Sequence, residues 1–528
     1  MALQTERFAD DWLDADYLEH LLDTQAHSAA HYGRLWDYFR NPLLPASGPV
    51  VAALNSNSRP YMQAQEAGLP ARITGVVGAT GRHDAIDLHR KEVVIENDIA
   101  WRIHTMVDFL FGRQPSIRSQ AADSAQAAAI NSVIAAVLES NGGVGFFQEL
   151  ALLGSVYGFV DIALRFPALG CGLPAPLPSQ PLPDDATSAS QAATGPGTPF
   201  APDAAGPARA WSKHDLARAL SAARNITLET IEAPRVLPIL DDNDYRNVRY
   251  WVQRYHTHPP RMASHRRWMG LKRSNSPACC EVIEILSPTW WQRYEDRVLT
   301  AEGANLLGRL PVVHVQNVAL PGSYEGLSDV EPLVSIQDEL NTRLSDRAYR
   351  VTYQAFKMYL GKGIDGFLER PIGPGQMWAT ENPLATVEEF GSDSGSPSED
   401  AHIQQVRDAM DKVSAVPPLA AGLLHGNLGN LTSATALRVL LGGLLARTEK
   451  KRLTYGLAIA RAIELVLEFL HVEGLLPTRP EDRRVEIHWS SPLPIDEGET
   501  LRNAQIKAQL GVPAGRLLAE LGYDGTQE

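Results

Sequence analysis

Two long helices and a set of short strands lead us to predict an α+β fold for this chain. Between Asp329 and Lys357, apolar residues recur every three or four positions, the spacing of one helix face. A second run of this kind extends from Thr432 to Leu470. Before both helices, residues 226–299 contain short runs rich in β-branched and aromatic residues, which is typical of strands.

The first long helix follows a short strand and a turn. Pro311–Val315 alternates as a strand does, and Asn317–Gly326 contains the turn residues Pro321-Gly322. The helix is predicted to begin with a capping box, in which Ser328 is the N-cap and Glu331 its partner. Asp329 is the alternative N-cap, and Pro332 favours it because proline is tolerated only in the first turn of a helix. One face of the predicted helix is apolar: Leu333, Ile336, Leu340, Leu344, Ala348, Val351 and Ala355. A second face is basic: Arg343, Arg347, Arg350 and Lys357.

Composition excludes several classes of protein. The chain has 528 residues, enough for more than one domain, and its formal charge of −14 argues against a globally basic surface that binds nucleic acid. Three cysteines, Cys171, Cys279 and Cys280, cannot form a disulfide framework, which suits a reducing compartment. No stretch reaches the ~18 uncharged apolar residues of a membrane span, and the first residues lack the pattern of a secretory signal. We therefore expect no membrane association.

Helical and strand patterns alternate before the long helices. An amphipathic helix over residues 5–41 should stop at Asn41-Pro42, and a helix over residues 97–111 should stop at Gly112 before a strand that follows Pro115. Further expected elements are helices 122–139 and 145–157 and strands 158–164, 226–231, 235–240, 248–255, 281–286 and 290–299.

Two segments interrupt this pattern. Residues 167–209 are dense in Pro, Ala, Ser and Gly, and this composition predicts a disordered insertion because it cannot bury enough apolar surface. Asp241–Asp244 lies between two strands and lacks the glycine-bearing calcium loop, so a plain turn is favoured over metal binding.

The chain beyond the first long helix alternates again between glycine-rich and helical segments. Residues 358–393 carry strand fragments at Leu368–Pro371, Met377-Trp378 and Val387. The remaining expected elements are a helix over 398–413 that ends before Pro417-Pro418, an uncharged loop over 419–430, the long helix over 432–470 with a kink at Gly442-Gly443, and helices over 501–510 and 514–521.

Chemistry-bearing residues do not form a convincing active site. Gly75–Gly81 could cradle a phosphate in a nucleotide-dependent enzyme, but Ala71–Thr74 is too short and too polar for the buried strand required. No Gly-x-x-x-x-Gly-Lys-Ser/Thr is present, because Phe356 stands where Gly361-Lys362 would need a glycine. We therefore expect no ATP-driven motor of the P-loop type.

Metal binding and base stacking are also disfavoured. The candidate metal ligands His256, His258, Cys279 and Cys280 lack the spacers of a tetrahedral site, so ordinary packing is the better interpretation. Trp251, Trp290 and Trp291 could stack on nucleotides, but a role in the core of the strands is favoured. No nucleophile, metal or cofactor site is predicted.

A series of short motifs, in order, resembles the portal protein of tailed double-stranded DNA bacteriophages. The motifs are Val107–Pro115, Pro311–Val313 with Asn317, Gly326–Asp329, Ile336–Asn341, Leu344–Asp346 and Asn430–Leu437. The last motif departs from the family in having Ala434 where glycine is usual. The resemblance covers residues 97–165 and 226–470.

The resemblance implies a portal fold with an α/β wing, long stem helices, a small β clip and a helical crown. The implied domains are a wing over 1–327 that includes the insertion, a stem helix over 328–357, a clip over 358–397, a second stem helix over 398–416, a tunnel loop over 417–431, a long kinked wing helix over 432–470 and a crown over 471–528. It further implies a structural role as a ring at one capsid vertex, and no catalysis.

The same resemblance implies partners and site residues. Partners would be further copies of the chain in a ring, usually of twelve, the large terminase subunit, head-completion or adaptor proteins, scaffold and major capsid proteins, and double-stranded DNA bound without sequence preference. The protein would reside in the virion, after assembly in the host cytoplasm. Channel candidates are His425, Asn427, Asn430, Arg343, Arg347, Arg350 and Lys357, and docking candidates in the clip are Lys362, Phe367, Arg370 and Trp378. The alternative is a nucleotide-dependent α+β enzyme that uses the Gly75–Gly81 loop.

Overall fold

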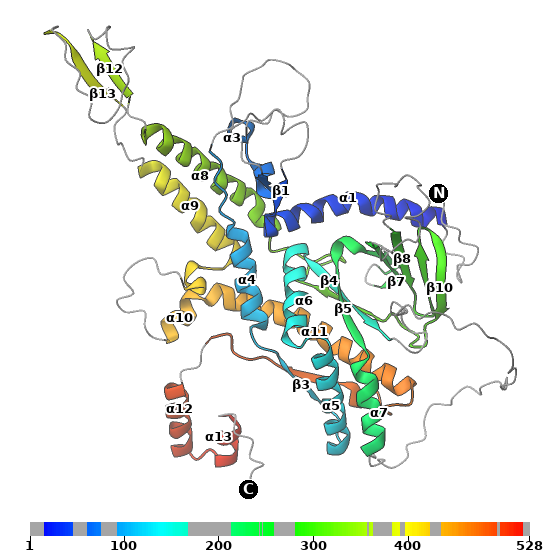
Figure 1. Ribbon diagram of the computed structural model, residues 1–528. Coiled ribbons are helices and arrows are strands. Elements are labelled where there is room, and N and C mark those ends of the chain that lie inside the picture. Colours follow the sequence, from blue (N-terminus) through cyan, green and yellow to red (C-terminus); the bar gives the residue numbers. More distant parts are fainter. Residues whose placement is uncertain are drawn as a thin grey trace, which may run out of the picture. The chain divides into compact units, whose positions relative to one another are not determined.

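A computed structural model describes most of the chain as two compact units (Figure 1). The described residues are 15–45, 61–74, 92–166, 213–241, 243–244, 247–257, 280–355, 358–362, 383–390, 397–422, 434–493 and 497–520. The sheet unit comprises Met1–Gly33, Met106–Ser328 and Gly429–Glu528, and the helix unit comprises Arg34–Thr105 and Asp329–Leu428. The division falls inside two helices, α1 (Ala15–Arg40) and α4 (Asp98–Phe111).

An antiparallel five-stranded sheet forms one part of the sheet unit, in the order β10-β9-β8-β7-β6. Its strands are β6 (Val236–Leu240), β7 (Val248–Thr257), β8 (Cys280–Leu286), β9 (Trp290–Glu295) and β10 (Val298–Ala304). Alternate residues of these strands and Leu18 and Leu22 of α1 build an apolar core cluster. The side-chain amide of Gln25 donates to the Val236 carbonyl at 3.0 Å, which fixes the same helix along β6.

The prediction of a single strand over residues 290–299 is wrong. The chain instead turns at Asp296 and Arg297, which have φ of 47° and 68°, and β9 and β10 pair as a hairpin. Neither residue is a glycine, so the sequence lacks the usual signal for a turn of this kind.

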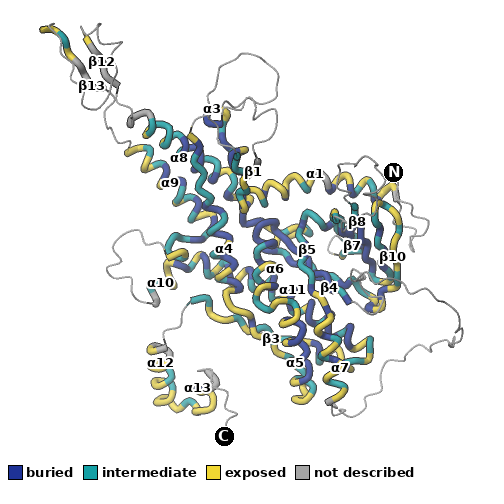
Figure 2. Tube along the Cα trace, viewed as in Figure 1, coloured by how far each residue is buried: buried dark blue, intermediate teal, exposed yellow. Residues whose placement is uncertain are grey.

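A three-stranded antiparallel sheet in the order β11-β4-β5 forms the second part of the sheet unit. Its strands are β4 (Phe159–Arg165), β5 (Thr227–Glu232) and β11 (Val312–Gln316). The helices of this region are α5 (Ser124–Ser140), α6 (Val144–Tyr157), α7 (Lys213–Arg224) and the 3-10 turn η2 (Ala233–Arg235). Figure 2 shows the central strand β4 among buried segments, and every residue from Phe159 to Leu164 is buried. The helices expected over 122–139 and 145–157 and the strands expected over 158–164 and 226–231 thus begin and end within two residues of α5, α6, β4 and β5. Helix α7 was not expected.

The predicted long helix of residues 432–470 is divided at the predicted position. It consists of α10 (Ala434–Leu440) and α11 (Gly442–Val472), separated by Leu441 with φ −89° and ψ 5°. Buried residues of α11 include Tyr455, Ile459 and Leu467. The remaining elements of this unit are β3 (Ser116–Ser119), which pairs with β14 (Val485–His488), and η7 (Glu481–Arg483), α12 (Glu497–Gln509) and α13 (Ala514–Glu520).

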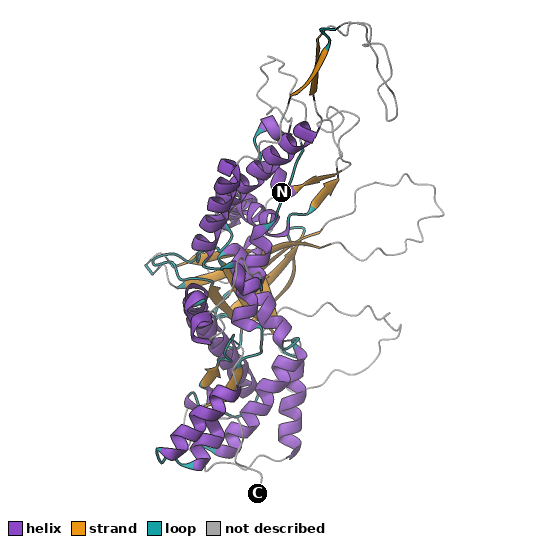
Figure 3. Cartoon of the chain, turned by 90° about the vertical axis from the view of Figure 1, so that its left-hand side faces the viewer, coloured by secondary structure: helices purple, strands orange, loops and turns teal. Residues whose placement is uncertain are grey.

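Two antiparallel helices dominate the helix unit, as Figures 1 and 3 show. They are α8 (Val334–Ala355) and α9 (Pro397–Ser414), which agree with the expected stem helices within a few residues. Their antiparallel direction follows from ion pairs that join the end of α8 to the start of α9. The other elements are β1 (Leu43–Pro45), β2 (Tyr61–Gln63), η1 (Ala64–Gly68), α3 (Ala71–Thr74), β12 (Met358–Lys362), β13 (Thr386–Phe390) and η6 (Pro418–Ala421).

The predicted capping box of the first long helix is wrong. A 3-10 turn, η4 (Glu331–Leu333), precedes α8, and its N-cap residue is Val330, which makes no side-chain cap bond. The Ser328 hydroxyl donates instead to the Val156 carbonyl at 2.6 Å within the sheet unit. The first helical turn thus begins at Glu331, after Val330 instead of after Ser328.

Among the described residues, no helix combines the length and the apolar character that crossing a lipid bilayer requires. The predicted insertion over residues 167–209 lies outside the described residues.

Candidate functional site

The basic face predicted for α8 is matched by acidic residues within the helix unit. Arg347 Nη1 lies 3.1 Å from Asp400 Oδ1, and Arg350 forms an ion pair with Glu399. Arg343 donates from Nε to Glu339 Oε1 at 2.7 Å and lies 3.7 Å from Asp346. The predicted channel arginines of the described chain are therefore charge-balanced by neighbouring carboxylates, and their contact with DNA stays a prediction.

Glu339 connects the same face to α9. Its carboxylate accepts from Arg343 and lies 3.0 Å from His402 Nε2. Partial burial acts to raise the pKa of Glu339, but the bonds from His402 and Arg343 outweigh burial and leave this pKa below its usual value. The carboxylate therefore remains charged where it faces the two basic side chains.

Most other predicted site residues lie outside the described residues: Lys357, Phe367, Arg370, Trp378, His425, Asn427 and Asn430. Lys362 is described, and it is the exposed last residue of β12, opposite Thr386 in β13. The roles assigned to all of these residues remain predictions.

The apolar stripe predicted along α8 is only partly the buried face of the helix. Leu333 and Leu340 are fully buried, but Val351 is 54% exposed. Three polar side chains, Gln337, Asn341 and Ser345, have no exposed surface. The inner face of α8 is therefore largely polar, and the expectation of one continuous apolar stripe is wrong.

These three side chains form a ladder of hydrogen bonds to the backbone of residues 94–98. Ser345 Oγ accepts from the Val94 N–H at 3.0 Å, Asn341 Oδ1 from the Glu96 N–H at 3.0 Å, and Gln337 Oε1 from the Asp98 N–H at 3.2 Å. Two bonds return, from Gln337 Nε2 to the Glu96 carbonyl and from Ser345 Oγ to the Val94 carbonyl. We call this set the polar ladder.

The spacing of the polar ladder follows from geometry. One step of four residues along a helix advances about 6 Å, and two residues of an extended chain advance about 6.6 Å. Side chains at positions i, i+4 and i+8 of α8 can thus meet every second N–H of the neighbouring segment. This periodic Gln, Asn and Ser was visible in the sequence, but sequence reasoning missed it because only apolar residues were counted as core.

The side-chain amide of Gln65 connects the polar ladder to the end of α1. Asn341 Nδ2 donates to Gln65 Oε1 at 3.0 Å, and Gln65 Nε2 donates to the Tyr38 carbonyl at 2.7 Å. Tyr38 donates to Asp338 at 2.6 Å, and burial together with this bond raises the pKa of the phenol. Burial also raises the pKa of the Asp338 carboxyl, although the bond from Tyr38 opposes this shift. Buried polar groups need such partners, because an unpaired one is costly.

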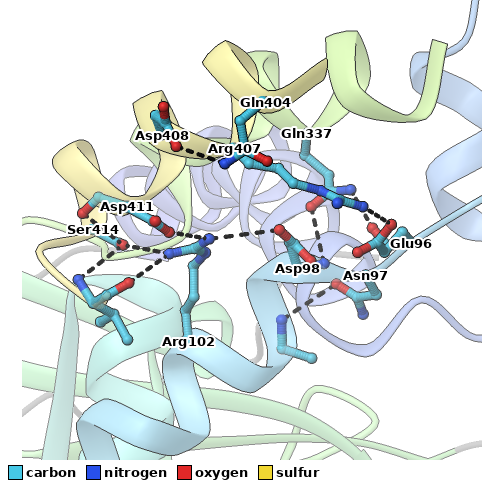
Figure 4. A network of polar contacts seen from close by, with 12 residues as sticks. Glu96, Asn97, Asp98, Arg102, Gln337, Gln404, Arg407, Asp408, Asp411 and Ser414 are labelled. Atoms are coloured by element: carbon cyan, nitrogen blue, oxygen red, sulfur yellow. Dashed lines mark hydrogen bonds and ion pairs between the residues drawn. The ribbon is translucent and has the colours of Figure 1, made fainter. Parts of the chain in front are cut away.

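A buried arginine connects α4 to the end of α9 (Figure 4). The Arg102 side chain is 2% exposed, and its Nη2 lies 2.7 Å from Asp411 and 3.5 Å from Asp98. Its Nη1 donates to Ser414 Oγ at 3.1 Å and to the Val416 carbonyl at 2.8 Å. Burial raises the pKa of Asp411 even though Arg102 opposes this shift. Arg102 was not predicted as a site residue. The sequence did contain a signal for it, because Arg102 is a basic residue four positions after Asp98 in an otherwise largely apolar helix.

A second basic residue, Arg407, lies in the same view. Its Nη2 is 2.6 Å from Glu96 Oε2, and its side chain is 36% exposed. Arg102 and Arg407 thus both join α9 to the chain around the start of α4, one buried and one at the surface.

The sheet unit contains a buried polar cluster around Asp161 of β4. This carboxylate, which has no exposed surface, accepts from Trp251 Nε1 at 2.7 Å and from the Tyr324 hydroxyl at 3.0 Å, and lies 2.7 Å from His314 Nδ1. Burial is the main reason that the pKa of Tyr324 is raised. The predicted core role of Trp251 and Trp291 is confirmed, with exposures of 1% and 6%.

The turn predicted over residues 317–326 is held by backbone contact between two glycines. Gly158 has φ of +96°, and a Cβ atom there would lie 2.4 Å from the Gly326 carbonyl oxygen. Asn317 next to this contact accepts from the Tyr455 hydroxyl at 3.1 Å and donates to the Leu327 carbonyl at 3.0 Å. Glycine is therefore required at positions 158 and 326, because a side chain at either would clash with the backbone of the other segment.

Among the described residues, no group of three or more His, Cys, Asp and Glu side chains could hold a metal ion. Of the candidate ligands, His256 and Cys280 lie on the adjacent strands β7 and β8, opposite Glu281 and Thr257 respectively, whereas His258 and Cys279 lie outside the described residues. The Gly75–Gly81 loop also lies outside them, and Ala71–Thr74 before it is a helical turn rather than the strand that a phosphate loop requires.

Comparison with known proteins identifies the family. No curated protein sequence matches the chain. The solved structures that are similar to the chain include "Virion of native gene transfer agent (GTA) particle", at 12% identity over 81% of this chain and 90% of that chain with a TM-score of 0.39. They also include "Neck of empty GTA particle computed with C6 symmetry", at 12% identity over 81% of this chain and 91% of that chain with a TM-score of 0.43. The family profile "Phage portal protein, SPP1 Gp6-like" matches residues 223–521, more than half of the chain. The chain therefore belongs to the phage portal protein family of the SPP1 Gp6-like type.

Proposed function

We propose that this protein forms a ring-shaped channel at one vertex of a phage-like capsid, through which DNA is packaged and ejected. The observation that carries the proposal is the family match over residues 223–521, which includes α8, α9 and α11. The protein's role in this proposal is structural, and the energy for packaging comes from a separate terminase.

The charge arrangement of the helix unit supports passage rather than retention of DNA. Each phosphate that a protein neutralises adds affinity through the release of counterions. The arginines of α8 are already paired with Glu399, Asp400, Glu339 and Asp346. A channel lined by such balanced pairs gives a moving duplex few places where it would bind tightly.

The proposal includes the partners and location that portal proteins have. Copies of the chain would assemble into a ring, with twelve as the usual number. The clip would dock the large terminase subunit and later the head-completion or adaptor proteins, while scaffold and major capsid proteins surround the ring. The ring would assemble in the host cytoplasm and remain in the virion.

The first experiment measures the size of the purified protein. Light scattering after gel filtration should give a mass many times 57.7 kDa, twelve times for a dodecamer. Negative-stain images should show closed rings with a central hole. A monodisperse monomer at micromolar concentration, in both low and moderate salt, would contradict the proposal.

A second experiment tests whether residues 419–430 border the DNA. This segment has no charged residue, so we expect Asn427→Lys with Asn430→Lys to permit ring assembly but to slow DNA packaging, more so at low salt, because the added charges bind phosphate. The matched control is Asn427→Gln with Asn430→Gln, which adds length without charge. Wild-type packaging rates for the lysine pair and for a deletion of Leu423–Leu428 would show that the segment does not face DNA.

A further inference from the structure

The structure places a completely enclosed cation where the chain leaves α9. Helix α9 ends at Ser414, and Val416 two residues later has no exposed surface. Arg102 is the side chain that reaches this point from α4, with 2% of its own surface exposed. Burial of a guanidinium group is unfavourable unless nearly every N–H donor is paired, so the contacts of Arg102 must compensate for the loss of water around its charge.

The contacts of Arg102 are divided between two tasks. Nη2 faces the carboxylates of Asp411 and Asp98, which balance its charge. Nη1 binds the Ser414 hydroxyl and the Val416 carbonyl, which belong to the segment that follows the helix. The cation also lies at the C-terminal end of α9, where positive charge is favoured by the helix dipole.

The backbone at this point has a conformation that needs support. Ala415 has φ of +58°, a left-handed value that is unfavourable for a residue other than glycine. The Val416 N–H returns to Ser414 Oγ at 3.2 Å, and Pro417 continues with an extended φ of −74° and ψ of 153°. The chain therefore changes direction within three residues, and Arg102 binds both ends of this turn.

We propose that Arg102 is a positioning residue that fixes the path of the chain from α9 into the turn η6. An arginine is required because one planar group must serve carboxylates on one side and a hydroxyl and a carbonyl on the other. A lysine has a single nitrogen and cannot reach both sets at once. In relation to the proposed function, on which this further step rests, the fixed turn leads directly into the segment predicted to border the DNA.

The test compares Arg102→Lys and Ser414→Ala with the control Arg407→Lys in assembled protein. Arg407 also joins α9 to the chain near α4, but its ion pair is with Glu96. Amide hydrogen exchange reports the stability of local structure residue by residue. The informative amides are those of Val416, Ala420 and Gly422, which donate to Ser414, Pro417 and Leu419.

We expect Arg102→Lys to speed exchange at all of these amides about tenfold or more, and Ser414→Ala to speed it mainly at Val416, whose acceptor it removes, while amides in the middle of α8 stay within about twofold. Arg407→Lys should leave all of them within about twofold. Unchanged exchange at residues 416–422 in Arg102→Lys would overturn the proposal. An equal increase throughout the helix unit would also overturn it, since that result indicates general loss of stability instead of positioning.

Packaging assays then separate this inference from the proposed function. If wild-type rings package DNA, Arg102→Lys rings should do so more slowly, and Arg407→Lys rings at the normal rate. If wild-type rings do not package DNA at all, the proposed function fails, while the exchange result still decides the role of Arg102. Equal packaging rates for all three proteins would overturn the link between the fixed turn and DNA passage.

Discussion

The core of the five-stranded sheet and the inner face of α8 are equally buried but chemically opposite. The sheet core consists of apolar and aromatic side chains such as Ile283, Ile285 and Val252, all without exposed surface. The inner face of α8 presents Gln337, Asn341 and Ser345, which are just as enclosed. One region is held by apolar contact and the other by the polar ladder.

The two kinds of contact differ in how precisely they fix the positions of the segments that they join. Apolar packing is non-directional, so a similar side chain can often replace another with modest loss. Hydrogen bonds to alternate backbone N–H groups are directional, and a shift of one residue along residues 94–98 would break all of them. The polar ladder therefore specifies register, while the sheet core contributes most through the area that it buries.

The largest expected effect is truncation in the sheet core. Ile285→Ala should lower the free energy of unfolding of the sheet unit by about 2–5 kcal/mol, because it removes buried methyl groups and leaves a cavity. The measurement is urea unfolding combined with amide exchange in β7, β8 and β9. Val298→Ala, at a position that is 51% exposed, is the control and should change little. A loss below about 0.5 kcal/mol for Ile285→Ala would show that this core does not determine stability.

An intermediate effect is expected in the polar ladder. Asn341→Leu keeps the size of the side chain but leaves the Glu96 N–H and the Gln65 amide oxygen without their partner. The expected loss is about 1–3 kcal/mol, because a buried unpaired group retains its full desolvation cost. Amide exchange of residues 94–98 should increase in this variant and not in Ser335→Ala, a control on the exposed side of α8. A neutral or stabilising Asn341→Leu would mean that apolar packing suffices in this region too.

The smallest effect concerns pH and distinguishes the end of α11 in the sheet unit from the polar ladder. The polar ladder has no titrating side chain, whereas His471 at the end of α11 accepts at Nδ1 from the Thr478 N–H at 3.1 Å. Burial, with the nearby Arg483, lowers the pKa of His471. The folded state then binds fewer protons than the unfolded state, so stability should fall as pH drops through about 6.5.

On acidification from pH 7.5 to pH 5.5, the melting temperature of the sheet unit should therefore fall more in the wild type than in His471→Gln. Exchange rates at residues 94–98, corrected for the intrinsic effect of pH, should not distinguish the two proteins. A parallel pH dependence of melting in both proteins would contradict the assignment to His471.

Local signals in the sequence were enough to locate most helices and strands. Helix α4 ends before Gly112, and α6 ends before Gly158, where glycine permits a positive φ. The separation of α10 from α11 was predicted from Gly442-Gly443. These elements were predictable because glycine, proline and apolar periodicity act on the nearest few residues. The β9–β10 hairpin was missed because its turn uses Asp296 and Arg297 instead of glycine.

The sequence by itself determined the fold class, the approximate bounds of α8, α9 and α11, and the family, because these depend on periodicity and on motifs within short segments. Tertiary structure alone decided which face of α8 is buried, which carboxylates pair with Arg347 and Arg350, and that Arg102 binds the turn after α9. Each of these depends on partners up to several hundred positions away in the chain, as with Arg102 and Val416. The partner of a polar side chain is set by three-dimensional distance and direction, and a one-dimensional pattern does not contain either quantity.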